Sequence, residues 1–253
     1  MNIIGERIGN YKVEERIWQG GTSTIYKGIS EDYRSICEDG IFDKVVAIKV
    51  LHPYRTEPYQ IEIFKKEFRI LKKLSHPNVI KVYQLGKKDN LYYIIMEYID
   101  GKSLRNFYGE NMEIFPQTIL DILIKVGEGI EYIHSKNIVH NDIKPENVIV
   151  GNSLRNIKII DFGYAEKISF FKIRKNLTGG TEKYIAPERK KGIIDLRSDI
   201  YSYCIMIEEF LSIFDFYKEI ASIIESGKSK DLSERPKIGT ILDVLREIYK
   251  KEL

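Results

Sequence analysis

The sequence predicts an α+β fold in which a small β-rich half is followed by a larger, mostly helical half. Runs of β-branched and aromatic residues, separated by turn residues, fill the first hundred positions. After Asp100-Gly101 the apolar residues instead occur in long segments with helical spacing. With 253 residues, of which 43% are hydrophobic and 30% charged, the chain has enough apolar material to bury a sizeable core.

The first half is predicted to form strands and one main helix. Turn residues such as Gln19-Gly20-Gly21 separate the apolar runs. A helix is expected at Ile61–Leu74, where apolar residues recur at helical spacing, and Ser75-His76-Pro77-Asn78 ends it. The predicted strands are Tyr11–Ile17, Thr24–Gly28, Val45–Leu51, Val79–Leu85 and Leu91–Tyr98.

The second half is predicted to be helical, with two short strands after its first helix. Long apolar-rich segments predict helices at Ile119–His134 and Asp199–Leu211, and an amphipathic helix at Ile238–Leu253. The strand-like runs are Val148–Val150 and Ile157–Ile160. A ligand site is expected where the two halves join, because clefts between units often bind ligands.

The composition excludes several classes of protein. Forty basic and thirty-seven acidic side chains leave a net charge of +3, too small to indicate nucleic acid or an anionic membrane as partner. Cys37 and Cys204 cannot form a disulfide framework and indicate a reducing compartment. The most apolar stretch, Leu91–Ile99, is too short to span a bilayer. A cytoplasmic globular protein is therefore expected.

Two features of the β-rich half point to a phosphate ligand. Gly20 and Gly21 lie between two predicted strands, where backbone N–H groups could face an anion, although an ordinary hairpin turn has the same pattern. Lys49 ends the apolar run Val46-Ala47-Ile48 and would be costly to bury unpaired. Glu67, on a helix face away from Phe64, is the expected partner. A lysine that only extends its amine to solvent is the alternative.

A cluster of polar residues in the helical half points to phosphoryl chemistry. Asp142, Lys144 and Asn147 lie between two apolar runs, and Asp161-Phe162-Gly163 follows the next one. An Asp and an Asn beside bound phosphates would form a hard oxygen site for Mg²⁺. A second Asp could take the proton of an acceptor hydroxyl, and the Lys could offset charge on the moving group. Any one of these residues alone could be a solvated turn residue.

With these motifs the sequence resembles the eukaryotic-type (Hanks-type) serine/threonine protein kinase catalytic domain, from about Tyr11 to the C-terminus. The resemblance implies a bilobal protein-kinase fold with an N-lobe at residues 1–98 and a C-lobe at residues 99–253. Only thirty-six positions separate Asp199 from Arg235, so the C-lobe is expected to be shortened there, with the helix that often docks substrates trimmed or absent.

The resemblance also implies a role for each motif residue, with ATP and Mg²⁺ as cofactors and Mn²⁺ as an alternative metal. Asp142 would be the catalytic base and Lys144 a phosphate ligand. Lys49, held by Glu67, would bind the α- and β-phosphates. Asn147 and Asp161 would bind the metal. The other residues expected to contact the nucleotide are Ile17, Gly20, Gly21, Ser23, Ile25, Ala47, Met96, Glu97, Ile99, Ser103 and Ile149.

Further residues match structural positions of the family. Asp199 matches a structural aspartate, and Arg235 is the expected buried partner of Glu188. Four residues would stack as a spine. They are Leu71, Val82, His140 and Phe162.

Lys144, together with Thr181 before the Ala186-Pro187-Glu188 segment, resembles serine/threonine rather than tyrosine kinases, so protein hydroxyls are the expected acceptors. Two other readings remain open. One is a pseudokinase that keeps the fold without the chemistry, and the other is a small-molecule kinase.

The glycine-rich loop departs from the family pattern. Trp18 and Ser23 occupy its first and third glycine positions, which predicts weaker nucleotide binding or a stiffer loop. Trp18 is expected to pack on the small lobe, with a lid over the ligand as the alternative. The long connection Ile29–Lys44 is read as a hairpin tip or a docking element for an unidentified regulatory partner.

The catalytic loop departs as well. Asn141 replaces the arginine that, in the family, pairs with a phosphate on the activation loop, so the kinase is predicted not to require loop phosphorylation. The candidate phosphorylation sites are Ser169, Thr178 and Thr181. Three neighbouring cations could bind such a phosphate, recognise an acidic substrate or simply be solvated. They are Lys172, Arg174 and Lys175.

Overall fold

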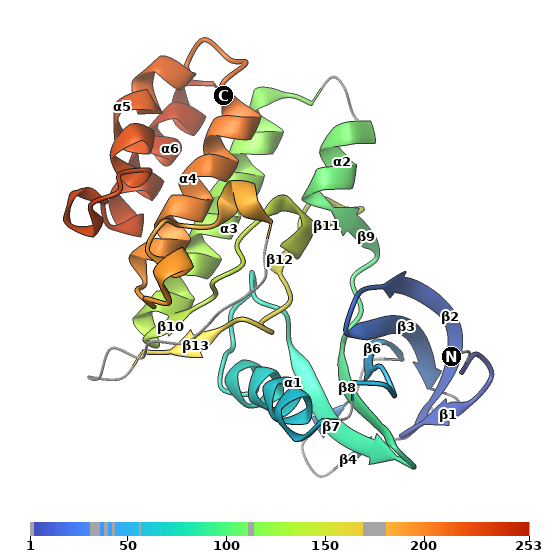
Figure 1. The fold of residues 1–253 in the computed structure, drawn as a ribbon. Helices are drawn as coiled ribbons and strands as arrows, with labels where there is room; N and C mark the ends of the chain where they lie inside the picture. The colour runs from blue at the N-terminus through green and yellow to red at the C-terminus, as the bar shows by residue number, and fades with distance from the viewer. Residues whose placement is uncertain are drawn as a thin grey trace. The chain divides into compact units, whose positions relative to one another are not determined.

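The computed structural model describes residues 3–30, 36–37, 40–41, 44–55, 57–110, 114–168 and 181–252. The chain forms two compact units. The first comprises Met1–Ser75 and Ile80–Asp100, and the second comprises His76–Val79 and Gly101–Leu253. The first is built on a β-sheet and the second is mainly helical, which confirms the predicted α+β class (Figure 1). The assignment of lobes to 1–98 and 99–253 stays a prediction, because compactness does not show which parts fold independently.

The first unit is organised around a six-stranded antiparallel sheet with the order β1-β2-β3-β6-β8-β7. Short connections join β1 to β2, β2 to β3 and β7 to β8, as expected for antiparallel neighbours. Another short pair, β4 (Ile36–Cys37) and β5 (Gly40–Ile41), lies apart from this sheet. The strands of the main sheet are β1 (Arg7–Ile8), β2 (Tyr11–Gln19), β3 (Ser23–Ser30), β6 (Val45–Leu51), β7 (Val82–Lys88) and β8 (Leu91–Glu97).

The side chains of β6 alternate between the two faces of this sheet. Val46, Ile48 and Val50 are buried in an apolar cluster that also contains residues of β1, β2, β3 and β8. Because successive side chains of a strand point to opposite faces, Ala47 and Lys49 are turned to the other face. The core of the first unit therefore fixes the direction in which Lys49 points.

The helix α1 (Pro58–Leu71) contacts β7 of the same unit. Pro58 suits the first turn, where a backbone N–H has no partner inside the helix. Phe64, Glu67 and Leu71 are its buried residues, so the charged Glu67 is held on the packed face. The predicted helix Ile61–Leu74 began and ended about one turn too late, because Pro58 starts the helix and its last residue is Leu71.

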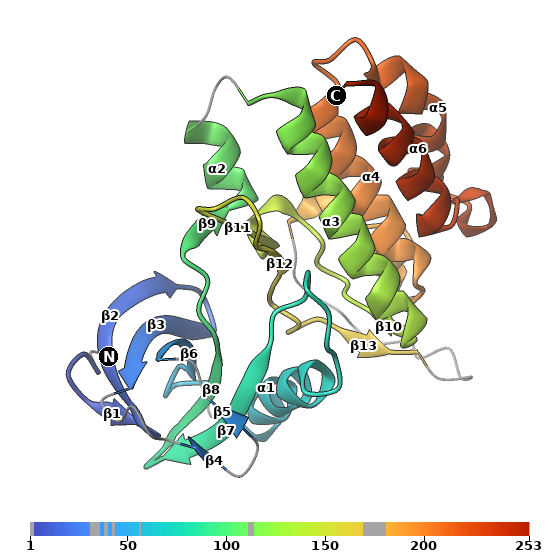
Figure 2. The same cartoon turned by 180° about the vertical axis from the view of Figure 1, so that it is seen from behind.

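The second unit is a group of helices packed around α3, with short strands beside it. Figure 1 and Figure 2 show α3 next to α4 and α6, with α5 on the outside. At Gly127 of α3 an added Cβ would lie 2.6 Å from Leu242 and 2.7 Å from Tyr203, so this glycine allows α4 and α6 to approach closely. The helices are α2 (Leu104–Glu110), α3 (Pro116–Ser135), α4 (Arg197–Leu211), α5 (Tyr217–Gly227) and α6 (Ile238–Lys251).

Short strands and 3-10 turns carry the segments between these helices. One small sheet has the order β12-β11-β9, and β10 pairs with β13. The strands are β9 (Gly101–Ser103), β10 (Ile138–Val139), β11 (Val148–Gly151), β12 (Ile157–Ile159) and β13 (Glu166–Lys167). The 3-10 helices are η1 (Pro145–Asn147), η2 (Glu182–Tyr184), η3 (Arg189–Lys191) and η4 (Leu232–Glu234).

Several elements differ from the predicted ones. The strand expected at Val79–Leu85 begins only at Val82, because Val79 forms a parallel bridge with Ile159 and the Asn78 amide donates to the Ile157 carbonyl at 2.9 Å. The segment before β7 thus belongs to the second unit. The helices α2 and α5 were not predicted, and α5 with η4 fills the short interval between Asp199 and Arg235.

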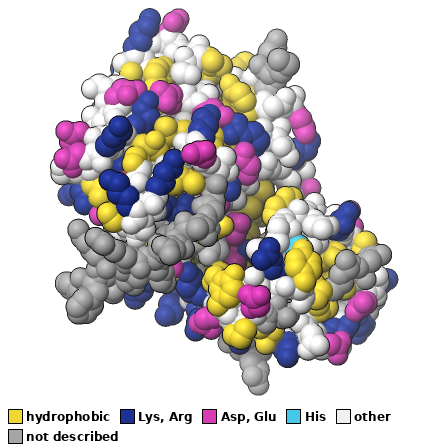
Figure 3. Space-filling model, viewed as in Figure 1, with side chains coloured by type: hydrophobic (Ala, Val, Ile, Leu, Met, Phe, Trp, Pro, Cys, Tyr) yellow, Lys and Arg dark blue, Asp and Glu magenta, His cyan; other side chains and the backbone are white. Residues whose placement is uncertain are grey.

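Acidic and basic side chains are interspersed on the face drawn in Figure 3. Within the described ranges, no helix combines the length and apolar character needed to cross a bilayer. Cys204 is a buried free thiol, and burial raises its pKa to about 12.

Candidate active site

Lys49 and Glu67 form a buried ion pair in the first unit. Lys49 Nζ donates to both carboxylate oxygens of Glu67, at 2.6 and 2.8 Å. The two residues are only 8% and 3% exposed. Burial without a partner would be strongly unfavourable for either charge, so each stabilises the other in this position. The predicted pair is confirmed, while its role toward phosphate stays a prediction.

The turn between β2 and β3 is closed by a hydrogen bond from Gly20 N to Ser23 O at 2.9 Å. A Cβ on Gly20 would lie 2.0 Å from Cη2 of Trp18, so the indole lies directly over this glycine. A Cβ on Gly21 would meet no atom within 4 Å. Trp18 packs over this turn of the small lobe, as expected, although the residue as a whole is 53% exposed.

The strand register places other predicted nucleotide contacts on the Lys49 face of the sheet. Ile25 is the register partner of Lys49, and Ala47 is the partner of Met96. The Glu97 N–H donates to the Lys81 carbonyl at 3.0 Å, so this N–H is already engaged within the chain. The remaining predicted contacts in this unit differ in exposure: Ile17 is exposed, Ser23 is buried and Ile99 is half-buried.

Two predicted nucleotide contacts lie in the second unit. Ile149 of β11 and Ser103 of β9 are register partners, so the sheet places them side by side. Ser103 Oγ accepts from the Asn106 N–H at 3.3 Å at the start of α2. Ser103 thus caps a helix, and its contact with ribose stays a prediction.

One carboxylate oxygen of Asp142, in the second unit, is contacted by both Lys144 and Asn147. Lys144 Nζ lies 2.8 Å from Asp142 Oδ2. Asn147 Nδ2, positioned by η1, donates to the same oxygen at 2.8 Å and to the Asp142 carbonyl at 2.8 Å. Asp142 and Asn147 are 7% and 6% exposed. The cluster predicted from the sequence is therefore present as a set of direct contacts.

The loop that carries Asp142 is anchored on Asp199 of α4. The fully buried Asp199 accepts the backbone N–H groups of His140 and Asn141, each at 2.8 Å, and His134 Nε2 lies 2.9 Å from the same carboxylate. These three contacts give the buried carboxylate the hydrogen-bond partners that a buried polar group requires. Asp199 thus has the structural position that was predicted for it.

His140 links the loop to the segment after β12. Its Nε2 lies 3.1 Å from the Ile160 carbonyl, and its Nδ1 accepts from the Asp142 N–H at 3.2 Å, a pattern that requires the neutral ring protonated at Nε2. The ring packs edge-on against Phe162, with centroids 4.6 Å apart. This is the spine contact that was predicted within the second unit.

Asn147 and Asp161 fit the chemistry of a hard divalent cation. The Asn147 amide nitrogen is held by Asp142, so its oxygen faces the other way. Asp161 adopts a left-handed backbone conformation with φ of 60°, which is uncommon outside glycine and characteristic of functional sites. No group of three or more His, Cys, Asp or Glu suited to a metal occurs among the described residues. Mg²⁺ needs no such group, because it is commonly bound by one or two protein oxygens together with substrate phosphates.

Asn141 contributes no charge to this site. Its φ of 67° is a conformation that asparagine tolerates better than most residues. Its Nδ2 donates to the Tyr164 carbonyl at 3.1 Å. Thr181 is exposed at the start of η2. Other residues predicted for this region lie outside the described ranges. They are Ser169, Lys172, Arg174, Lys175 and Thr178, and parts of Ile29–Lys44.

Glu188 and Arg235 form the predicted buried ion pair. Arg235 binds the Glu188 carboxylate with two hydrogen bonds of 2.7 and 2.8 Å, and Ser198 Oγ donates to it at 2.6 Å. Burial opposes ionisation of Glu188, but the bonds from Arg235 and Ser198 outweigh it and lower its pKa. This pair joins the residue before η3 to the residue after η4.

The sequence reasoning missed a polar cluster that joins α2, η2 and α4. Arg105 and Tyr184 both donate to the carboxylate of Glu209, Lys183 lies 2.8 Å from it, and Arg105 Nη2 donates to the Tyr184 hydroxyl at 2.6 Å. Burial alone would raise the pKa of Glu209. The hydrogen bonds from Arg105, Lys183 and Tyr184 lower it by more than burial raises it, so the pKa is about 2. Nothing in the local pattern of these residues indicates that they meet, because they are far apart along the chain.

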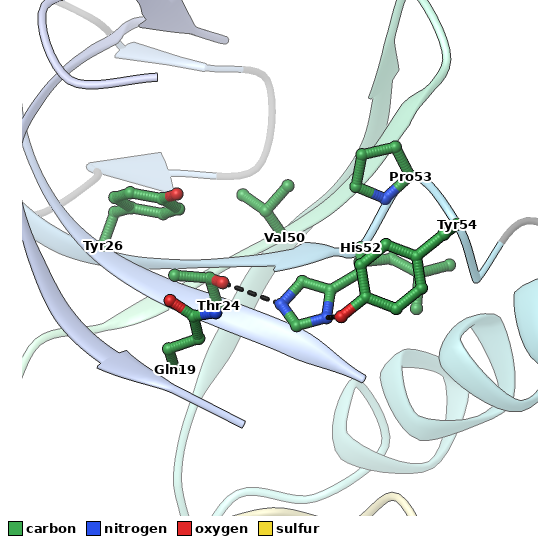
Figure 4. A pocket seen from close by; sticks show the side chains of 8 residues that line it. Gln19, Thr24, Tyr26, Val50, His52, Pro53 and Tyr54 are labelled. Atoms are coloured by element: carbon green, nitrogen blue, oxygen red, sulfur yellow. Dashed lines mark hydrogen bonds between the residues drawn. The ribbon is translucent and has the colours of Figure 1, made fainter. Parts of the chain in front are cut away.

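A cavity of about 110 Å³ in the first unit lies away from Lys49 (Figure 4). Thr24 and Val50, which line it, are register partners on the opposite face of the sheet. His52 is bonded at both ring nitrogens, to Thr24 at 2.9 Å and Tyr54 at 2.7 Å, and burial lowers its pKa. This cavity is separate from the predicted nucleotide contacts.

Comparison with known proteins agrees with this geometry. The family model described as "Protein kinase domain" matches residues 11–246. The chain is 35% identical over 214 residues to the serine/threonine-protein kinase PrkC of Bacillus subtilis, covering 83% of this chain and 32% of that protein. It is 34% identical over 211 residues to a probable serine/threonine-protein kinase of Clostridium acetobutylicum, covering 82% of this chain and 31% of the relative.

The serine/threonine-protein kinase PknL of Mycobacterium tuberculosis is 31% identical over 207 residues, covering 80% of this chain and 49% of that protein. The chain thus spans only 31% to 49% of the length of these relatives. The family match extends over nearly the whole chain and includes every motif described above. The chain therefore belongs to the protein kinase family.

Proposed function

We propose that this chain is a serine/threonine-protein kinase that transfers the γ-phosphoryl group of ATP to hydroxyl groups of proteins. The observation that carries the proposal is the convergence of Lys144 and Asn147 on one oxygen of Asp142, in a loop anchored by Asp199. The relatives, which are serine/threonine-protein kinases by name, support the same acceptor class. The protein's substrates are to be identified by experiment.

In this proposal Asp142 takes the proton of the acceptor hydroxyl. Because Lys144 and Asn147 both bind Oδ2, we assign the proton to Oδ1. Lys144, already 2.8 Å from the carboxylate, would offset negative charge on the transferring group. Lys49, held by Glu67, would bind the phosphates of the nucleotide.

Asn147 and Asp161 would hold Mg²⁺ through their side-chain oxygens. When bound, the ion neutralises charge on the phosphate oxygens. Asn147 can serve in this way while its nitrogen orients Asp142, because the two atoms of its amide face different directions. The same residues would accept Mn²⁺, which prefers similar ligands.

We further propose that activity does not depend on phosphorylation of the activation loop. Asn141 cannot form the charge-assisted pair that an arginine makes with phosphate. Asp199 already fixes the loop through the N–H groups of His140 and Asn141. The cytoplasmic location, and the absence of nucleic acid or membrane as partner, stay predictions from the sequence.

The test is transfer of label from radioactive ATP to a generic protein substrate in the presence of Mg²⁺. Asp142→Asn serves as the inactive variant, and the exposed Asp215→Asn as the matched control. Transfer no greater than that of Asp142→Asn would favour a pseudokinase. Label in free metabolites but not in protein would favour a small-molecule kinase.

Treatment with phosphatase tests the second part of the proposal. Activity is expected to survive complete dephosphorylation. Loss of activity that returns when Ser169 or Thr178 is phosphorylated again would contradict it.

A further inference from the structure

Arg189 is a buried cation with an unused edge. It begins η3, directly after Glu188, and is only 3% exposed. Among the described residues, neither Nε nor Nη2 has a hydrogen-bond partner. The N–H groups of these two nitrogens lie along one edge of the guanidinium and form the fork that binds a carboxylate in a bidentate manner. Leaving such donors buried and unpaired is unfavourable, so their retention calls for a functional reason.

The positive charge of Arg189 lies close to the predicted catalytic loop. Its guanidinium carbon lies 5.2 Å from the centre of the Tyr164 ring, within the range of a cation–π contact. Burial lowers the pKa of Arg189, while the carboxylates of Asp142 and Asp199 and the Tyr164 side chain oppose that change. An arginine remains protonated under these conditions. A positive charge is thus held near both the predicted base and the residue that anchors its loop.

Asn141 has a buried acceptor without a donor among the described residues, whereas Arg189 has buried donors without an acceptor. Its Nδ2 donates to the Tyr164 carbonyl, but its buried Oδ1 has no hydrogen-bond partner among the described residues. Tyr164 therefore contacts both side chains, Asn141 through its backbone and Arg189 through its ring. An unsatisfied acceptor and an unsatisfied donor fork occur around the same residue.

We propose that Arg189 is a positioning residue for the catalytic loop, and that its buried guanidinium, held over Tyr164, supplies the cation that position 141 lacks. The inference rests on the proposed kinase function. The positive charge beside the loop comes from Arg189, because Asn141 carries none. Arg189 acts through Tyr164, whose ring it contacts and whose carbonyl accepts from Asn141, and it does not touch the reacting atoms.

A double-mutant cycle in thermal unfolding tests the coupling without requiring activity. Asn141→Asp adds a negative charge to the loop near the Arg189 cation, and aspartate also tolerates the left-handed backbone. Asn141→Asp changes the melting temperature by some amount in the wild-type background and by another amount in the Arg189→Gln background. We expect the first value to be higher than the second by about 2–4 °C. Lys190→Gln, which removes an exposed cation from the same short helix, is the matched control and should show no coupling. Equal effects of Asn141→Asp in the wild-type and Arg189→Gln backgrounds would overturn the coupling.

Steady-state kinetics of phosphatase-treated protein test the positioning role. Arg189→Gln should lower kcat by about tenfold or more while the KM for ATP changes little, and Arg189→Lys, which keeps the charge, should retain most of the activity. Equal losses in both variants, or full activity of Arg189→Gln, would overturn the inference. If the wild type itself transfers no phosphate, the proposed function fails, and the unfolding cycle still decides whether Arg189 and Asn141 are coupled.

Discussion

Asp142 is oriented by two donors that share one of its oxygens. Lys144 and Asn147 lie 2.8 Å from Oδ2, and a third bond ties the Asn147 amide to the Asp142 carbonyl. The carboxylate therefore has little rotational freedom. Orientation of this kind lowers the entropic part of a reaction barrier.

Replacement of Lys144 by Met should reveal this contribution. Methionine keeps much of the side-chain length but removes the charge beside Asp142. We expect kcat to fall by about 10²–10³, the range for loss of a preorganised electrostatic contact, with a small change in the KM for ATP. The measurement is steady-state phosphoryl transfer, with the exposed Lys136→Met as control. An unchanged kcat would show that Lys144 has no role in the reaction.

The buried ion pair between Glu188 and Arg235 should contribute strongly to the stability of the fold. Arg235→Met leaves a buried carboxylate without its bidentate partner, which should reduce the free energy of unfolding by about 3–5 kcal/mol. The double variant with Glu188→Met should recover part of the loss. Arg246→Met removes a half-exposed pair with Glu128 and should cost less than about 1 kcal/mol. Denaturant unfolding measures all three, and equal losses in Arg235→Met and Arg246→Met would count against the pair.

At the scale of elements, the β2–β3 hairpin depends on the contact between Trp18 and Gly20. An added Cβ at Gly20 would force the indole away, whereas Gly21 has open space. Trp18 is the single tryptophan of the chain, so its fluorescence reports on this turn alone.

Gly20→Ala should shift the tryptophan emission to longer wavelength, because the displaced indole becomes more exposed to water. Gly21→Ala is the matched control and should leave the spectrum unchanged. The measurement is steady-state emission of the folded variants. Identical spectra for the two variants would mean that the indole does not rest on Gly20.

The cluster around Glu209 connects α2, η2 and α4, and it makes stability depend on pH. The pKa of Glu209 is about 2 in the folded chain, below its usual value of 4.5. A lowered pKa means that the stabilisation is fully present above pH 4.5 and is lost as the pH falls toward 2.

Glu209→Gln should therefore melt at a lower temperature than the wild type at neutral pH, and the difference should narrow between pH 4.5 and 2. The exposed Glu247→Gln is the control. Melting curves over this pH range provide the measurement. A constant difference across the range would show that the ionised Glu209 is not what joins these elements.

At the scale of the whole molecule, the predicted ligand residues come from both compact units. Lys49 belongs to the first unit, and Asp161 belongs to the second. The proposed binding of ATP and Mg²⁺ would stabilise the folded chain by mass action, by about 2.7 kcal/mol at a hundred times the dissociation constant.

This stabilisation should raise the melting temperature by about 5–10 °C. Lys49→Met and Asp161→Asn should each remove most of the rise, although the two residues lie in different units, and EDTA should remove the part due to the metal. Asp215→Asn should behave as the wild type. Thermal shift assays provide the measurement. A full rise in either site variant would exclude that residue from the nucleotide site.

The local pattern predicted most elements because each one buries a periodic apolar face. The strand β6 was predicted with its observed ends, Val45 and Leu51, because it is a nearly continuous apolar run rich in β-branched residues. The start of β7 was predicted three residues too early because Val79 pairs with a distant strand, and distant pairing leaves no local signal. The helix α5 was missed although Ile220 and Ile224 recur at helical spacing, because its N-cap residue, Phe216, gives no start signal.

The sequence by itself determined the family, the order of its motifs and the pairs Lys49–Glu67 and Glu188–Arg235. A charged residue in an apolar run needs a partner of opposite charge. The positions of the family motifs predict which residue that partner is. Only the tertiary structure decided that Trp18 covers Gly20 and that Glu209 receives three donors. It also decided that, within the described part of the chain, the fork of Arg189 and the amide oxygen of Asn141 have no partner around Tyr164. These contacts join residues far apart in the chain, so they arise from packing, which short-range patterns do not encode.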